Sequence, residues 1–159
     1  MKKNTDKHYM RLALAAADRG VAKGQTPFGA CIVKNRKVVV TAHNVVWKTT
    51  DITAHAEINA IRLACKKLKT IDLSGCVIYS TCEPCPMCFA ACHWARIDKI
   101  IHGTFIRDAS LIGFNELAIS NNAMKHQGKS LVKIKGGFMR KENKALFQRW
   151  AQGKSKRAY

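Results

Sequence analysis

Two short motifs decide how the fold and chemistry of this sequence are interpreted: His-Ala-Glu at residues 55–57 and Pro-Cys-Pro-Met-Cys at residues 84–88. One imidazole and two thiolates can hold a zinc ion and leave a fourth coordination position open. Zinc held in this way lowers the pKa of a bound water to about 7, which provides a nucleophile at neutral pH. The spacing therefore predicts a catalytic zinc site with His55, Cys85 and Cys88 as its ligands.

The glutamate of the first motif, Glu57, lies two residues after the expected histidine ligand. On its own, an acidic residue in the first turn of a helix commonly interacts with the helix dipole and has no further role. Beside three zinc ligands, it is suited to take a proton from water and pass it to a substrate. We therefore interpret Glu57 as the catalytic acid and base of the site.

A closed structural zinc site is the alternative interpretation, and it requires a fourth protein ligand. Cys82 and Cys92 are the spare thiols near the second motif. Cys82 precedes Cys85 across a proline, and Cys92 follows Cys88 by one helical turn. Both placements favour packing over coordination, so we expect an open site.

The length of 159 residues fits one domain, residues 1–159, which can bury a substantial core without disulfides. The seven cysteines are odd in number and suggest no disulfide framework, which suits a reducing compartment. No apolar run is long enough to span a bilayer, and polar residues follow the basic start of the chain where a signal peptide would be apolar. We expect a cytoplasmic protein without a membrane segment.

The net charge of +18 is unevenly distributed. Residues 125–159 contain eleven Lys or Arg residues and a single acidic residue, Glu142. Such a surface is compatible with nucleic acid binding, but a solvated basic surface is the more common explanation when no reading motif accompanies it. Nucleic acid is therefore a partner that the charge allows and does not favour.

Hydrophobic periodicity predicts helices that alternate with strands. This alternation is typical of a layered α/β fold with helices on both faces of a sheet. Residues 108–119 are compatible with a short helix or a loop, and the helix near residue 54 is expected to carry His55 and Glu57 in its first turn. The expected helices cover residues 5–23, 54–67, 84–96 and 142–151, and the expected strands cover residues 29–33, 37–42, 76–81, 97–103 and 131–134.

The whole chain resembles the cytidine deaminase-like superfamily, and within it the bacterial guanine deaminases. The pairing of His-x-Glu with Pro-Cys-x-x-Cys is the signature of zinc-dependent nucleobase deaminases. The resemblance extends to further residues along the chain, which are Pro27-Phe28-Gly29-Ala30, Asn44, Thr53 to Glu57, Cys82 to Cys88, Trp94-Ala95-Arg96, Gly113-Phe114 and Tyr159.

The resemblance implies a three-layer α-β-α fold with a five-stranded mixed sheet, one Zn²⁺ per chain and a homodimer. It also implies that residues from about 140 to 159 are exchanged between subunits. Asn44 would hydrogen-bond a purine, Phe28 and Trp94 would line or stack on it, and Tyr159 would close the site. Guanine deaminases typically have two aspartates after Gly-Phe, and Glu116 stands at the second of these positions, where it would act as an extra proton shuttle.

Three functions remain open at this point. Hydrolytic deamination of a free nucleobase, with guanine giving xanthine and ammonia, agrees with the resemblance best. A tRNA-specific adenosine deaminase shares the zinc signature, but such enzymes usually have valine at the position of Phe28 and lack the Trp-Ala-Arg sequence. A catalytically silent, zinc-containing RNA-binding module is the alternative outside the enzymes.

Overall fold

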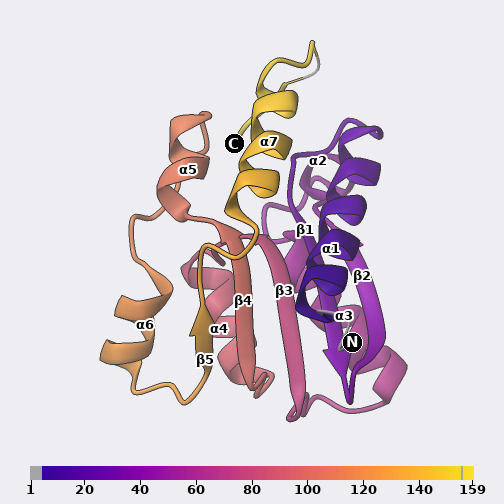
Figure 1. Ribbon diagram of the computed structural model, residues 1–159, viewed down its shortest axis with the longest axis vertical. Helices are drawn as coiled ribbons and strands as arrows, with labels where there is room; N and C mark the ends of the chain where they lie inside the picture. Colours follow the sequence, from indigo (N-terminus) through magenta and orange to yellow (C-terminus); the bar gives the residue numbers. More distant parts are fainter. Residues whose placement is uncertain (1–4, 155) are drawn as a thin grey trace.

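The computed structural model describes residues 5–154 and 156–159, which form seven helices and five strands, and the strands make up one sheet (Figure 1). The chain alternates between the two kinds of element for most of its length, as the hydrophobic pattern predicts. In chain order the elements are α1 Thr5–Val21, β1 Gly29–Lys34, β2 Lys37–His43, α2 Val46–Thr49, α3 Ala56–Leu68, β3 Cys76–Cys82, α4 Pro86–Trp94, β4 Lys99–Thr104, α5 Ile106–Leu111, α6 Asn121–Gly128, β5 Lys133–Lys135 and α7 Arg140–Ala151.

The sheet has the strand order β2-β1-β3-β4-β5 and is mixed. Strand β1 pairs antiparallel with β2 and β3, whereas β3, β4 and β5 run parallel. The β1–β2 hairpin turns at Asn35 and Arg36, which both have φ values in the left-handed region. A two-residue type I′ turn requires this conformation at both positions, which explains the hairpin predicted there.

Helices cover both faces of the sheet, so the expected three-layer architecture is confirmed (Figure 1). Alternate residues of one strand enter different cores, as the two-residue period of a strand requires. Cys31 joins the smaller core under α1 with Tyr9 and Met10, while Ile32 joins the larger core that contains Ala60 of α3. The parts of the chain that the structure describes contain no helix long and apolar enough to cross a membrane.

Several element boundaries differ from the sequence prediction. Helix α3 begins at Ala56, so His55 is the N-cap residue and lies before the first turn. The helix expected from the prolines at 84 and 86 begins at Pro86, and Cys85 is its N-cap. Helix α5 ends at Leu111, and the last strand is shorter and shifted towards the C-terminus. Helices α2 and α6 were not predicted, because they have only four and eight residues and little apolar periodicity.

Candidate active site

The three expected metal ligands converge at the start of two helices. His55 and Cys85 are the N-cap residues of α3 and α4, and neither side chain caps its own helix. The Nδ1 atom of His55 lies 3.7 Å from Sγ of Cys85 and 3.6 Å from Sγ of Cys88. A tetrahedral zinc ion with ordinary bond lengths separates nitrogen and sulfur ligands by about 3.6 Å. The donor atoms therefore fit a zinc ion without rearrangement.

The spare thiols do not complete a closed site. Sγ of Cys82 contacts the backbone oxygen of Phe105 at 3.7 Å, and Cys92 is buried in the larger core. Among the residues that the structure describes, His55, Cys85 and Cys88 form the one group of three or more potential ligands within coordination distance of one another. The arrangement leaves a position for a non-protein ligand, as a catalytic zinc site requires.

The electrostatics of the cluster favour metal binding through a thiolate. A hydrogen bond with the Cys88 thiol and, against opposing burial, another with His55 lower the pKa of Cys85 to about 4. The N-terminus of α4 adds the positive end of a helix dipole beside this sulfur. Cys85 is therefore a thiolate at neutral pH, which is the form that coordinates zinc.

Glu57 lies in the first turn of α3 with 5% of its surface exposed. The Ser80 hydroxyl donates a hydrogen bond of 2.7 Å to one carboxylate oxygen, and Sγ of Cys88 lies 3.5 Å from the other. Burial raises the pKa of Glu57, and the Ser80 hydrogen bond opposes this shift. The structure thus places a buried carboxylate with a raised pKa against a ligand of the metal.

A pocket of about 270 Å³ opens above the metal ligands. Its walls are mainly apolar, with one carboxyl group from the segment that follows α5. A smaller inner cavity continues from it towards Phe28 and Glu57. The residues that line the outer pocket are Ile52, His55, Cys85, Pro86, Met87, Phe114, Asn115, Glu116, Leu117 and Tyr159.

Glu116 lies in both the outer pocket and the inner cavity. Burial and, to a smaller extent, the nearby Cys85 thiolate raise the pKa of Glu116 to about 7. A carboxyl group with this pKa exchanges protons readily at neutral pH. Its position is therefore compatible with the proton-shuttle role expected from the sequence.

Three of the expected substrate contacts lie close together: Phe28 and Tyr159 line the inner cavity, and the buried Asn44 contacts Tyr159. Phe28 is buried and meets the Phe114 ring edge-on, with centroids 4.9 Å apart. The side chain of Asn44 is fully buried, and its Nδ2 group donates to the Tyr159 hydroxyl at 2.6 Å. The Tyr159 ring lies 5.7 Å from that of His55. Tyr159 therefore lines the pocket of its own chain, while its role in closing the site and the exchange of the C-terminal residues between subunits stay predictions.

Trp94 is not brought to this site within one chain. It is the last residue of α4 and 82% of its surface is exposed, and it is absent from the described residues that line the pocket. Its expected contact with a substrate stays a prediction, because only a second copy of the chain could supply it.

The structure adds Ser80 and Glu83, which the sequence analysis did not single out. Glu83 accepts hydrogen bonds from the backbone N–H groups of Ile106 and Asn121, and Asn121 in turn donates to the Pro84 carbonyl. These contacts tie the loop before Cys85 to the starts of α5 and α6. The signals that could have found them are a serine in a largely apolar strand and a glutamate directly before the Pro-Cys-Pro-Met-Cys motif.

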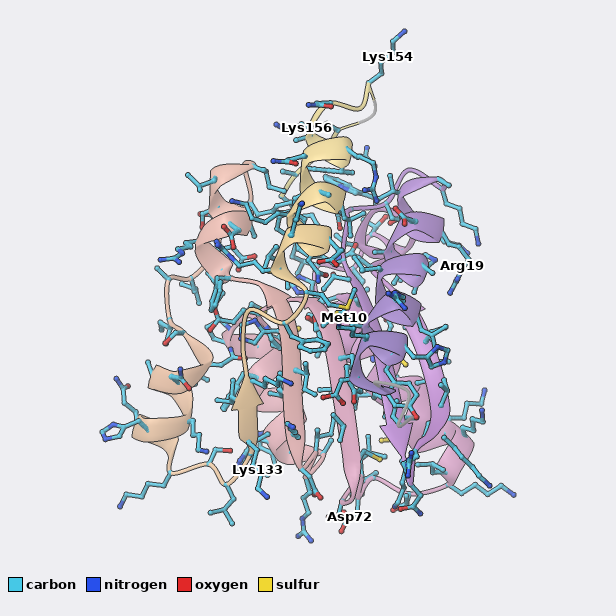
Figure 2. All side chains as sticks on the ribbon, in the orientation of Figure 1. Met10, Arg19, Asp72, Lys133, Lys154 and Lys156 are labelled. Carbon is cyan, nitrogen blue, oxygen red and sulfur yellow. The ribbon has the colours of Figure 1, made fainter. Side chains whose placement is uncertain are left out.

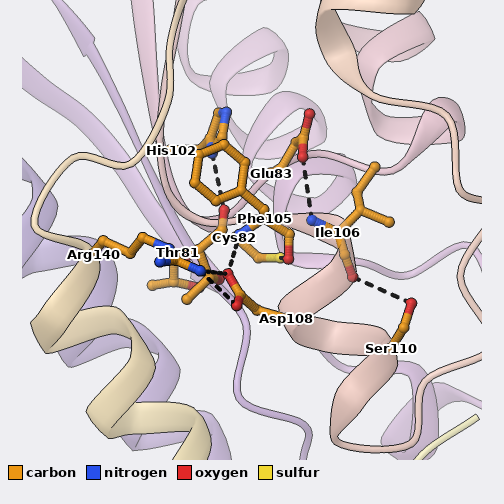
Figure 3. Close-up of polar contacts among 10 residues, drawn as sticks. Thr81, Cys82, Glu83, His102, Phe105, Ile106, Asp108, Ser110 and Arg140 are labelled. Carbon is orange, nitrogen blue, oxygen red and sulfur yellow. Dashed lines mark hydrogen bonds and ion pairs between the residues drawn. The ribbon is translucent and has the colours of Figure 1, made fainter.

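A second polar cluster lies beside the contact between Glu83 and Ile106 (Figure 3). Arg140 at the start of α7 donates to both carboxylate oxygens of Asp108 in α5, at 2.8 and 3.0 Å. Asp108 also accepts from the backbone N–H of Phe105. The pair therefore joins α5, which precedes the Glu116 segment, to α7, which precedes Tyr159.

Comparison with known proteins agrees with this geometry. Residues 3–104 match the family model described as the cytidine and deoxycytidylate deaminase zinc-binding region. The chain is 35% identical to a guanine deaminase of Bacillus subtilis over 95% of its own length and 97% of that protein. It is 46% identical to a tRNA-specific adenosine deaminase of Aquifex aeolicus over 59% of its length and 62% of the relative.

Among solved structures, a guanine deaminase from Nitrosomonas europaea superposes with a TM-score of 0.85 at 26% identity, covering 96% of this chain and 87% of the other. The shared five-stranded sheet and the match to the zinc-binding region cover the elements that carry His55, Cys85 and Cys88. The chain therefore belongs to the zinc-dependent cytidine and deoxycytidylate deaminase family.

Proposed function

We propose that this protein is a guanine deaminase, which converts guanine and water to xanthine and ammonia. One observation carries the proposal: Tyr159 and two of the three potential metal ligands line a small pocket, and the buried Glu57 lines the inner cavity that continues from it. A pocket of about 270 Å³ accommodates a single base. The near full-length similarity to a guanine deaminase supports the same substrate.

The residues of the chain then divide the chemistry between them. Zinc held by His55, Cys85 and Cys88 supplies a Lewis acid that activates water at neutral pH. Glu57 would accept a proton from the attacking water, deliver it to a ring nitrogen of the base, and then pass the second proton of that water to the amino group, which leaves as ammonia. Glu116, with a pKa of about 7, provides a second proton relay at the pocket wall.

The remaining contacts orient the base. Phe28 offers a ring for stacking at the inner cavity, which Tyr159 also lines, and Asn44 and Tyr159 provide polar groups. The proposal includes a homodimer, since Trp94 is exposed on its own chain and would meet a base only in the pocket of a second copy. Seven cysteines without a disulfide support a reducing compartment, so we place the enzyme in the cytoplasm.

Ammonia release from a substrate panel tests the proposal. The panel contains guanine, guanosine, adenine, cytosine and a tRNA anticodon stem-loop, each with the zinc-loaded protein. Guanine should react fastest, and the Glu57→Gln variant should keep its zinc and lose activity by about 100- to 10,000-fold. Inert guanine with a reactive tRNA would reject the proposal in favour of the second candidate.

The second candidate, a tRNA-specific adenosine deaminase, is favoured by the net charge of +18 and by the similarity to the Aquifex aeolicus enzyme. The two candidates differ in their response to salt. Neutralisation of several phosphates makes tRNA affinity fall steeply with salt concentration, whereas binding of an uncharged base is almost insensitive to it. RNA binding without ammonia release from any compound would instead indicate the non-catalytic module.

A further inference from the structure

Residues 156–159, here called the tail, lie against the short helix α2. The indole Nε1 of Trp47 in α2 donates a hydrogen bond of 2.9 Å to the backbone oxygen of Arg157. The guanidinium carbon of Arg157 lies 3.6 Å from the centroid of the Trp47 ring, which is a close cation–π contact. One tryptophan side chain therefore holds both the backbone and the side chain of the same tail residue.

Two residues further on, Tyr159 enters the candidate active site. Its ring lies 6.1 Å from Trp47 and 5.3 Å from Phe114. Its hydroxyl accepts from Asn44, and its backbone oxygen accepts from the N–H of Asn115 at 3.0 Å. Trp47 thus contacts the tail at the point where it approaches the pocket, and the other contacts hold the residue that closes it.

A short terminal segment without secondary structure pays a conformational entropy cost when it is ordered, and a few contacts must offset that cost. The tail lies beyond the end of α7, and its backbone forms part of no helix or strand. The Trp47 contact is therefore a substantial part of what fixes its position. Trp47 lies three positions after Asn44, so the same stretch of chain contacts the tail at Arg157 and at Tyr159.

We propose that Trp47 is a positioning residue that recognises the tail through Arg157 and thereby keeps Tyr159 over the pocket. The proposal concerns regulation of the site described above and rests on the proposed function for its kinetic consequences. It assigns to α2 a docking site for a segment with a cationic side chain two residues before a tyrosine. Trp47 touches no reacting atom and acts only through the tail.

The fraction of time that the tail is bound against the pocket can be compared between variants without any deaminase assay. Carboxypeptidase A removes aromatic residues from accessible chain ends, so the release of free tyrosine from the folded 159-residue chain reports the accessibility of Tyr159. Trp47→Ala should accelerate this release about tenfold, because it removes a cation–π contact and a hydrogen bond together. Trp47→Phe keeps an aromatic face and loses the donor, so it should accelerate release about threefold.

Substitution of Arg157, the other residue of this contact, gives an independent test. Arg157→Ala should accelerate tyrosine release to a similar extent as Trp47→Phe, and the Trp47→Ala, Arg157→Ala double variant should add little to Trp47→Ala alone. Arg157→Lys, which retains the cation, should lie closer to the wild type. Lys154→Ala is the matched control, because it removes one positive charge from the same exposed region and should leave release unchanged.

Steady-state kinetics with guanine complete the test. A displaced tail should raise KM about tenfold in Trp47→Ala while kcat changes by less than about twofold, since the groups around the metal are untouched. Tyrosine release at the wild-type rate in Trp47→Phe and Arg157→Ala, or effects of the two residues that simply add, would overturn the proposal. If guanine is not a substrate, the proposed function fails while the release measurements still decide the role of Trp47.

Discussion

Replacement of Ser80 by alanine tests the support of the proposed catalytic glutamate. The Ser80 hydroxyl donates a hydrogen bond of 2.7 Å to Glu57, and both side chains are buried. A hydrogen bond to a charged group contributes about 1.5–3 kcal/mol, and the buried site offers little water to replace it. If that contribution is lost at the transition state, kcat/KM falls by about 10- to 150-fold.

The pH dependence of Ser80→Ala has a defined direction. The Ser80 hydrogen bond lowers the pKa of Glu57, so its removal raises that pKa further. Glu57 must be deprotonated to accept a proton from water, and a higher pKa leaves less of the active form at neutral pH. The loss of activity should therefore be largest at low pH and shrink as the pH rises.

Ammonia release from guanine between pH 6 and 9 measures this effect, together with the zinc content of each variant. Ser110→Ala serves as the control, because it also removes a hydrogen-bonding serine hydroxyl, but one that donates to the backbone oxygen of Ile106 at 3.3 Å, outside the pocket. The control should retain full activity. Activity of Ser80→Ala within about twofold of the wild type across this pH range would refute the argument for the hydrogen bond.

Further predictions concern stability and the metal. Asp108→Asn removes the charge that pairs with Arg140 and should lower the free energy of unfolding by about 2 kcal/mol and Tm by about 4–8 °C, measured calorimetrically. Although burial opposes it, the Phe105 N–H and Arg140 hold the pKa of Asp108 below its usual value. The stabilisation by Asp108 is therefore complete above about pH 4 and disappears as the pH falls through the lowered pKa, so the two proteins should converge there. Gly103→Ala should cost about 1–3 kcal/mol in chemical denaturation, because a Cβ at this position overlaps the buried Asn143 side chain. Dialysis against a chelator should abolish ammonia release, and one equivalent of zinc should restore it; undiminished activity of metal-free protein would contradict the assignment.

The sequence predicts the architecture well because the hydrophobic patterns that indicate helices and strands involve residues close together in the chain. Long periodic helices such as α1 and α3 and the apolar strands β1 and β3 agree with their predicted ranges to within about two residues. The metal ligands were predictable because coordination chemistry restricts both residue types and spacing. Helices α2 and α6 were not predicted because their positions depend on tertiary contacts, such as the hydrogen bonds that Asn121 makes with the Glu83–Pro84 loop.

The pocket walls were only partly predictable, for a related physical reason. Phe28 and Tyr159 are far apart in the sequence, and only the closed fold brings both to one inner cavity. Ser80 escaped because a single serine in a strand is compatible with packing alone. Trp94 was expected to contact a base from the family resemblance, but it lies on the surface of the single chain, and its contact with a substrate stays a prediction.

The contact between Asn44 and Tyr159 has a consequence for selectivity. One N–H of the Asn44 amide already has an acceptor when no substrate is present, so a purine that approaches this N–H competes with the phenol oxygen of Tyr159. The net contribution of Asn44 to the binding free energy is then the difference between its hydrogen bond to the purine and its hydrogen bond to Tyr159, which are of similar strength. A base that presents an oxygen to Asn44 can replace the phenol without loss, whereas one that presents an amino group sets donor against donor at a cost of about 1–3 kcal/mol. Under the proposed function, the resident tyrosine thus acts as a reference ligand against which oxo- and amino-substituted rings are distinguished.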